Sequence, residues 1–98
     1  MFEHARQLAT SKKKDDREIA AFILGQLGTP ERPFKGESLP LLQKLCADRS
    51  AEVRETAVAS LGHLKAVEAI DSVKQLKRDN DESVQKMARY VERQLRTR

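Results

Sequence analysis

Three side chains of this sequence belong to the types that most often serve as nucleophiles, near-neutral bases or soft metal ligands: His4, Cys46 and His63. A catalytic or metal-binding histidine needs a partner residue, and the sequence places none beside either histidine. Cys46 is the only cysteine, so it forms no disulfide within the chain and belongs to no zinc-binding cluster. Gly25 and Gly28 end a helical pattern instead of following a strand, which excludes a phosphate-binding loop. The sequence therefore predicts no catalytic, cofactor or metal site, and a protein that is not an enzyme.

The composition indicates a single helical domain. The chain has 98 residues, of which 39% are hydrophobic, 35% charged and 4% aromatic, with no Trp. A chain of this length buries one core or one short stack of repeats, and few aromatic residues disfavour a sheet. The longest apolar stretches, 19–24 and 39–42, fall far short of the ~20 residues that cross a bilayer, and the N-terminus lacks the apolar core of a signal peptide. We therefore expect one domain over residues 1–98, a cytoplasmic location and no membrane partner.

Apolar residues recur at spacings of three and four along three long segments, which is the period of a helix that buries one stripe. The stripes predicted for 15–28, 50–64 and 81–95 are Ile19, Ala20, Ile23, Leu24 and Leu27; Val53, Ala57, Leu61 and Leu64; and Val84, Met87, Ala88, Val91 and Leu95. Shorter helices are expected just before them, at 2–9, 38–47 and 66–77. Asp81 is the expected N-cap of the last helix and Ser38 that of the helix at 38–47, with Pro40 in its first turn.

The six predicted helices form an internal repeat. The segment 17–27 aligns with 54–64 and shares Arg, Glu, Ala, Leu, Gly and Leu at equivalent positions, and 39–64 aligns with 70–95. A single helical hairpin cannot bury its apolar face alone, whereas about three stacked hairpins form a continuous core. The alignments place a small residue at one position of every repeat, where helices can approach closely: Ala20, Ala57 and Ala88. The sequence predicts an all-α fold with repeats at approximately 1–28, 38–64 and 66–97.

The segment Asp48–Leu64 resembles the second half of a HEAT repeat, of the short bacterial type first noted in phycobilisome lyases. The resemblance covers nearly the whole chain. It implies an α-α superhelix, a short HEAT-like solenoid of about three helical hairpins whose second helices line the concave side. A looser resemblance, over Ala20–Gly28, is to bacterial HEAT proteins proposed as immunity partners of Rhs-type toxins.

The resemblance also implies a ladder of charged side chains between repeats, at Arg17, Asp48, Arg54 and Asp79. Ser11 stands at the aspartate position of the first repeat, and Gln85 stands at the arginine position of the third. The ladder is therefore incomplete at both ends, and the outer repeats are expected to be capping units.

One enzyme of the same repeat type, the di-iron deoxyhypusine hydroxylase, is similar around the second helix but takes its metal from His-Glu pairs. The matching pairs here are Arg17-Glu18 and Arg54-Glu55. Because a permanently charged arginine cannot ligate iron, the resemblance implies the scaffold without that metal site. A lyase-like role in bilin attachment would rest on the repeat family alone.

Helical phase places another set of residues opposite the buried stripe, since each residue turns the helix by about 100°. If the second helices line a groove, these residues face a partner: Glu18, Phe22, Glu55, His63, Lys86, Tyr90 and Arg93. Phe22 and Tyr90 are then aromatic anchors on a polar surface. In the alternative interpretation Phe22 packs beneath the connection 29–37 and Tyr90 against the C-terminal end. Phe34 either contacts a partner or folds back onto the core, and Cys46 is expected to be a partly exposed small filler.

These observations predict a non-catalytic scaffold that binds another protein through the groove. The alternative is a nucleic-acid-binding module, because the formal charge is +4 and cations cluster at Lys12, Lys13 and Lys14 and at Lys86, Arg89, Arg93, Arg96 and Arg98. The same cations also suit a solvated helix end. An accessory or lyase-like role, a toxin-immunity role and self-association through the open ends of the solenoid are further alternatives.

Overall fold

The computed structural model describes residues 2–26 and 35–96. In chain order the elements are α1 (Phe2–Ala9), α2 (Lys14–Gln26), α3 (Lys35–Leu45), α4 (Ala51–His63), the short 3₁₀ helix η1 (Val67–Ala69), α5 (Ile70–Leu76) and α6 (Glu82–Arg96). The described residues contain no strand. The predicted all-α fold is confirmed.

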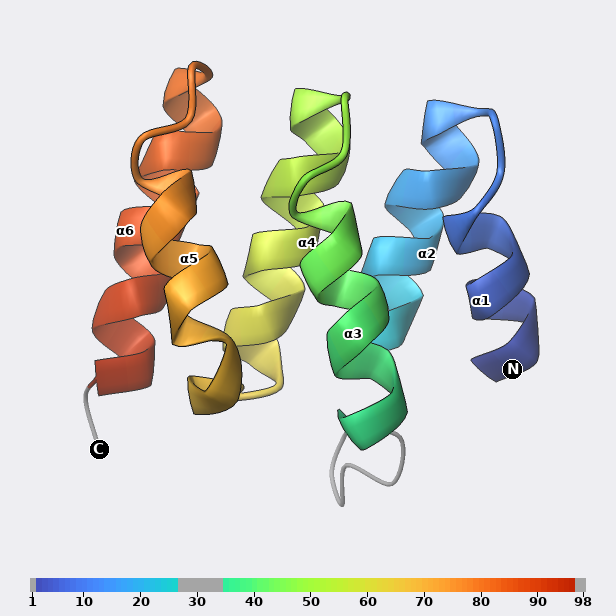
Figure 1. Cartoon of the computed structure of the whole chain (residues 1–98), viewed down its shortest axis with the longest axis horizontal. Coiled ribbons are helices and arrows are strands. Elements are labelled where there is room, and N and C mark those ends of the chain that lie inside the picture. The colour runs from blue at the N-terminus through green and yellow to red at the C-terminus, as the bar shows by residue number, and fades with distance from the viewer. Residues whose placement is uncertain (1, 27–34, 97–98) are drawn as a thin grey trace.

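The helices form three hairpins that stack side by side (Figure 1). Within each hairpin the first helix packs on the second: α1 on α2, α3 on α4 and α5 on α6. The second helices form a continuous row, because α4 lies between α2 and α6 and packs on both. The first helices α1, α3 and α5 cover one side of this row, and the first and last helices, α1 and α6, lie at opposite ends of the stack.

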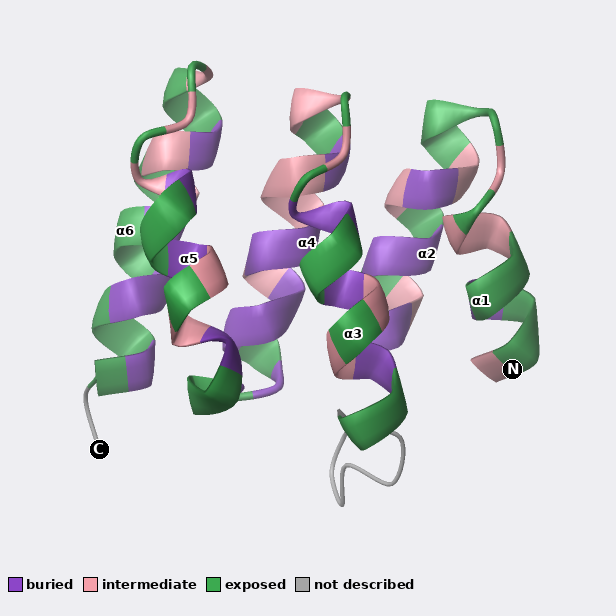
Figure 2. Cartoon of the chain, in the orientation of Figure 1, coloured by how far each residue is buried: buried purple, intermediate pink, exposed green. Residues whose placement is uncertain are grey.

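The core follows the predicted apolar spacing. Buried residues recur on every helix of the stack (Figure 2). The largest fully buried side chains include Leu24, Leu42, Leu61, Leu64, Val53, Val73, Val84 and Val91. The three equivalent alanines are also fully buried, which fits a position where helices approach closely: Ala20, Ala57 and Ala88.

Ile19 departs from the predicted stripe, since 49% of its surface is exposed. Its equivalent in the second hairpin, Thr56, faces α2 and places its hydroxyl 3.4 Å from the Glu18 carboxylate. In the described structure no second helix precedes α2, so Ile19 occupies a contact position without a neighbouring helix. The spacing alone could not distinguish these two situations.

The start of α3 also differs from the prediction. The helix begins at Lys35, so Ser38 lies inside it, fully buried, and is not its N-cap. Pro40 consequently lies beyond the first turn, on the exposed side of the helix. By contrast, the Val84 N–H donates to the Asp81 side chain over 3.1 Å, which confirms Asp81 as the cap of α6. Phe34, Gly28 and Arg98 lie outside the described residues.

Candidate interaction surface

Two arginine–aspartate pairs connect consecutive hairpins. The Arg17 guanidinium donates to both carboxylate oxygens of Asp48, from Nε over 2.7 Å and from Nη2 over 3.2 Å. The Arg54 guanidinium binds Asp79 in the same way, with distances of 2.8 and 3.0 Å. Because both pairs are largely buried, each forms a fixed two-point contact between neighbouring hairpins.

Each pair also fixes the turn that precedes a second helix. The Asp48 carboxylate accepts the Ser50 N–H over 2.9 Å, and the Asp79 carboxylate accepts the Asp81 N–H over 2.9 Å. The arginines complete the contact by donating to a backbone carbonyl, Arg17 to that of Ser11 and Arg54 to that of Asp48. The ladder thus sets both the start of α4 and α6 and the spacing of the hairpins.

Ser11 and Gln85, the neutral residues at the two ends of the ladder, form the hydrogen bond within their own turn but carry no charge for an ion pair between hairpins. The Ser11 hydroxyl accepts the Lys13 N–H over 3.1 Å, as the two aspartates do in their own turns. The Gln85 amide donates to the Asp79 carbonyl, as the arginines do to theirs. Two charged pairs are therefore enough for the two junctions among the three hairpins that the structure describes.

The electrostatics of the ladder depend on two opposing effects. Burial alone would raise the pKa of Asp48 and Asp79, because it disfavours the charged carboxylate. The hydrogen bonds from Arg17 and Arg54, together with the backbone N–H groups and the nearby positive charge, outweigh burial and lower the pKa of both aspartates below the ordinary value. Both side chains are therefore carboxylates at neutral pH.

Gly25 lies in the last turn of α2, as the pattern predicted, and packs against α4. A Cβ at this position would lie 2.6 Å from the Ser60 hydroxyl oxygen. That hydroxyl donates to the Ala21 carbonyl over 2.7 Å, so Ser60 is fixed against α2. Gly62 plays the same part at the next junction, where a Cβ would lie 3.1 Å from Val91. The shared glycine in the repeat alignment was the sequence signal for this contact.

The surface opposite the first helices, the second-helix face, is defined by Glu18 and Phe22 on α2, Glu55 and Ala59 on α4, and Lys86 and Tyr90 on α6. Phe22 has 57% of its surface exposed and Tyr90 has 54%. The Tyr90 hydroxyl accepts a hydrogen bond from the Gln94 side chain over 3.0 Å, while its ring stays open to solvent. Both rings are therefore largely exposed, and most of the connection 29–37 and the C-terminal end, on which the alternative interpretation packed them, lie outside the described residues.

The structure brings only part of the predicted site together. Glu55, Lys86 and Tyr90 line one shallow pocket of about 250 Å³ between α4 and α6, with Ser83 and Met87. Glu18 lies by Thr56 at the α2–α4 junction, and α4 separates Phe22 from Tyr90. His63 and Arg93 are exposed but do not line this pocket.

The basic residues of α6 are partly neutralised. The Glu92 carboxylate forms ion pairs with Lys77 over 2.7 Å and with Arg96 over 3.0 Å. These contacts lower the pKa of Glu92, first through the hydrogen bond from Lys77, against the opposing effect of burial. Arg96 is therefore part of an ion pair, whereas Lys86 and Arg89 are exposed cations.

Cys46, the candidate nucleophile of the sequence, lies in the hydrophobic core. Cys46 is buried, with 6% of its surface exposed, so the expected partial exposure is wrong. Burial raises the pKa of its thiol to about 12, which keeps it protonated and unreactive. Across residues 2–26 and 35–96, no three His, Cys, Asp or Glu side chains gather to hold a metal ion. None of the described helices has the length and apolar character needed to cross a membrane.

Comparison with known proteins gives one result for the whole stack. A family model described as HEAT repeats matches residues 2–91, a range that begins with α1 and ends inside α6. No curated protein matches the chain.

Proposed function

The chain belongs to the HEAT-repeat family, and from that premise we propose that it is a non-catalytic protein-interaction module whose partner binds the second-helix face. The observation that carries the proposal is the exposure of two aromatic rings, Phe22 at 57% and Tyr90 at 54%. Partly exposed aromatic side chains on a polar surface are typical of the residues that dominate protein–protein binding.

The composition of the face supports a protein partner of mixed polarity. Ala59 occupies the position on α4 that Phe22 and Tyr90 occupy on the neighbouring helices. A small side chain therefore lies between the two aromatic anchors. Acidic side chains lie on α2 and α4 and a basic side chain lies on α6. A partner would place apolar groups on the two rings, and its charged groups would remain at the polar rim.

Affinity capture tests this function. The tagged chain is incubated with lysate of the source organism, half of it treated with nuclease, and the recovered proteins are identified by mass spectrometry. We expect a stoichiometric protein in both halves, because the proposed contacts are to protein side chains. Recovery that disappears with nuclease would contradict the proposal.

A nucleic-acid-binding function is the second candidate, favoured by the exposed cations Lys86 and Arg89 on α6 and the net charge of +4. It predicts an affinity that falls steeply with salt, because bound phosphates release counterions. Reversing the charge of Lys86 and Arg89 would then abolish binding to a DNA or RNA oligonucleotide.

The finer family resemblances suggest what the capture could recover. A toxin among the bound proteins would support the immunity role, and a phycobilisome component would support the accessory or lyase-like role. We infer a cytoplasmic location for either, since the single thiol of Cys46 fits a reducing compartment.

A further inference from the structure

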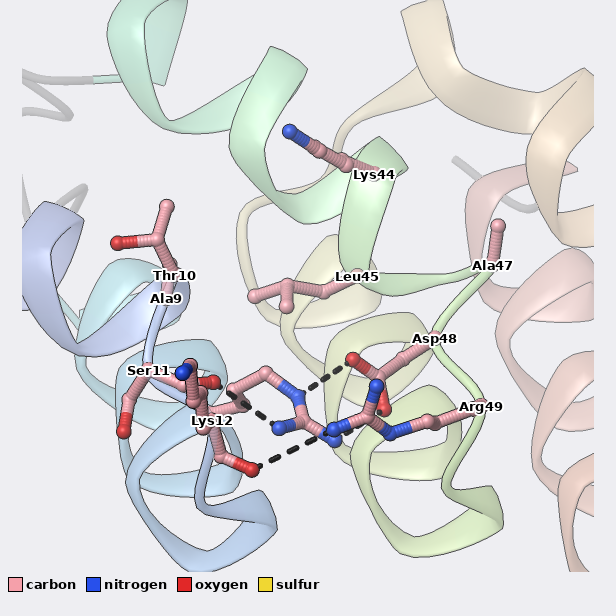
Figure 3. A pocket seen from close by; sticks show the side chains of 10 residues that line it. Ala9, Thr10, Ser11, Lys12, Lys44, Leu45, Ala47, Asp48 and Arg49 are labelled. Atoms are coloured by element: carbon pink, nitrogen blue, oxygen red, sulfur yellow. Dashed lines mark hydrogen bonds and ion pairs between the residues drawn. The ribbon is translucent and has the colours of Figure 1, made fainter.

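A pocket of about 530 Å³ lies at the edge of the stack where the turn between α1 and α2 meets the turn between α3 and α4. Figure 3 shows Thr10, Ser11 and Lys12 on one side and Asp48 and Arg49 on the other, with Leu45 between them. Lys44 projects from α3 at the upper rim in this view. The volume is within the range of sites that bind small molecules, ~300–1,000 Å³.

The charges that line this pocket are mainly positive. Lys12, Lys44 and Arg49 all line it and are exposed, and none of them forms an ion pair with a carboxylate among the described residues. The one acidic residue in the lining, Asp48, already accepts both donors of the Arg17 guanidinium. The pocket therefore presents three cationic side chains, and its single carboxylate is bound by Arg17 and also attracted to the charge of Arg49.

The backbone at the ends of α1 and α3 does not offset this charge. Carbonyl oxygens at a helix C-terminus carry partial negative charge, but here they accept hydrogen bonds from the turns that follow. The Gln7 carbonyl accepts the Thr10 N–H over 3.2 Å, and the Leu45 carbonyl accepts the Asp48 N–H over 3.1 Å. The Lys12 carbonyl accepts the Arg49 guanidinium over 3.4 Å, which places Arg49 across the two turns.

The next junction shows that these cations are not needed to join two hairpins. The positions equivalent to Lys44 and Arg49 in the third hairpin hold the neutral residues Gln75 and Asn80. The Arg54–Asp79 pair forms there with nearly the same distances as Arg17–Asp48. The fold is therefore compatible with neutral residues at these two positions, so Lys44 and Arg49 are not required to join the hairpins.

We propose that this pocket binds a diphosphate group. Lysine and arginine side chains bind phosphate oxygens through charge-assisted hydrogen bonds, and the planar guanidinium of Arg49 can donate two at once. Several cations around one pocket match the several negative charges of a diphosphate. The group could be free pyrophosphate or the diphosphate of a nucleotide, and separate titrations distinguish these sources.

The test is isothermal titration of the full chain with pyrophosphate, and separately with ADP, at one fixed salt concentration. The variant Lys44→Gln with Arg49→Asn introduces the residues that the third hairpin itself carries. The control, Lys74→Gln with Arg78→Asn, removes the same charge from a smaller pocket of about 320 Å³ on the third hairpin, which Lys74, Lys77 and Arg78 line, and so tests whether clustered positive charge alone is sufficient for binding. Circular dichroism on all three proteins establishes that they are folded.

We expect pyrophosphate to bind the wild-type chain at or below about 1 mM, and the pocket variant at least about tenfold more weakly, while the control binds as the wild type does. Lys12→Gln alone should weaken binding as well, which keeps the test valid if the double variant fails to fold. Equal affinity for ADP would identify the diphosphate as the recognised group, and tighter binding of ADP would identify a nucleotide. Absent binding, or equal weakening in the pocket and control variants, would overturn the proposal.

Discussion

Asp48 and Asp79 are the residues on which the geometry of the stack most depends. Each accepts a two-point contact from the arginine of the preceding hairpin and a backbone N–H from its own turn. A carboxylate can accept all of these bonds at once, whereas an amide offers one acceptor oxygen. The requirement for aspartate therefore follows from the number of donors that point at it.

Replacing Asp79 with Asn should destabilise the chain. The Arg54 guanidinium would remain mostly buried without a carboxylate, and a poorly satisfied buried group costs roughly 1–3 kcal/mol. Urea unfolding followed by circular dichroism measures this loss in the free energy of unfolding. Glu3→Gln is the control, because the Arg6–Glu3 pair is exposed and such pairs contribute little. Equal effects of the two substitutions would show that the ladder does not stabilise the junction.

The ladder also predicts how stability depends on pH. The pKa of Asp48 and Asp79 is lowered in the folded chain, so their stabilising contribution is fully present above the unfolded value of about 3.9 and is lost as the pH falls through the lowered folded value. Urea unfolding at a series of pH values should show a steep fall in stability below about pH 4. Changing both aspartates to Asn should flatten this dependence, and an unchanged pH profile in that variant would contradict the assignment.

At the scale of the elements, the approach of neighbouring second helices depends on glycine. Gly25→Ala would place a Cβ 2.6 Å from the Ser60 hydroxyl oxygen, and relieving this overlap should cost about 1–3 kcal/mol of unfolding free energy. Gly36→Ala is the matched control, because a Cβ there meets nothing within 4 Å and alanine favours the helix. Thermal unfolding of both variants tests this contact. A Gly25→Ala variant as stable as Gly36→Ala would show that the helices do not meet there.

Equivalent positions on successive helices have different surroundings, which gives a second prediction. Ile19→Thr introduces the residue that α4 carries at the same position, and should change stability by no more than about 0.5 kcal/mol because Ile19 is half exposed. Val53→Thr, which buries a hydroxyl at a fully enclosed site, should cost about 1–3 kcal/mol. Urea unfolding of both variants measures the two losses in the free energy of unfolding, and their ratio is then compared with this expectation. A large loss for Ile19→Thr would mean that this side chain is covered.

Most of the element-level description could be predicted from the sequence. The apolar spacing and the repeat alignment located all six helices, and Asp81 was recognisable as a cap. The exposure of Ile19 was not predictable, because periodicity identifies a helix face without revealing whether another helix lies against it. The start of α3 was also missed, since Ser38 has the type of a capping residue but is buried inside the helix.

The candidate site was predictable in part. Helical phase placed Phe22 and Tyr90 on the surface opposite the core, but only the structure shows that both rings are exposed. The pocket shared by Glu55, Lys86 and Tyr90 depends on the spacing between α4 and α6, which the sequence does not specify. The cationic pocket between the first two turns was missed for the same reason, since Lys12, Lys44 and Arg49 meet only when the hairpins stack.

At the scale of the whole molecule, the row of second helices is both the centre of the packing and the proposed binding face. The ladder at the turns, the glycine contacts between neighbouring second helices and the buried alanines hold the row together. Its outer side bears two exposed aromatic rings that no described contact buries. The molecule thus separates residues that hold the stack together from residues available for binding.

The most direct test of this account is the affinity of the captured protein partner for the variant Phe22→Ala with Tyr90→Ala. The rings are exposed, so helical content should stay at the wild-type level, while loss of two aromatic anchors should weaken binding by about 30-fold or more. Val67→Ala, which trims an exposed side chain on η1, should bind as the wild type does. Unchanged affinity in the folded double variant would contradict binding through the second-helix face, and loss of helical content would contradict the exposure of the two rings.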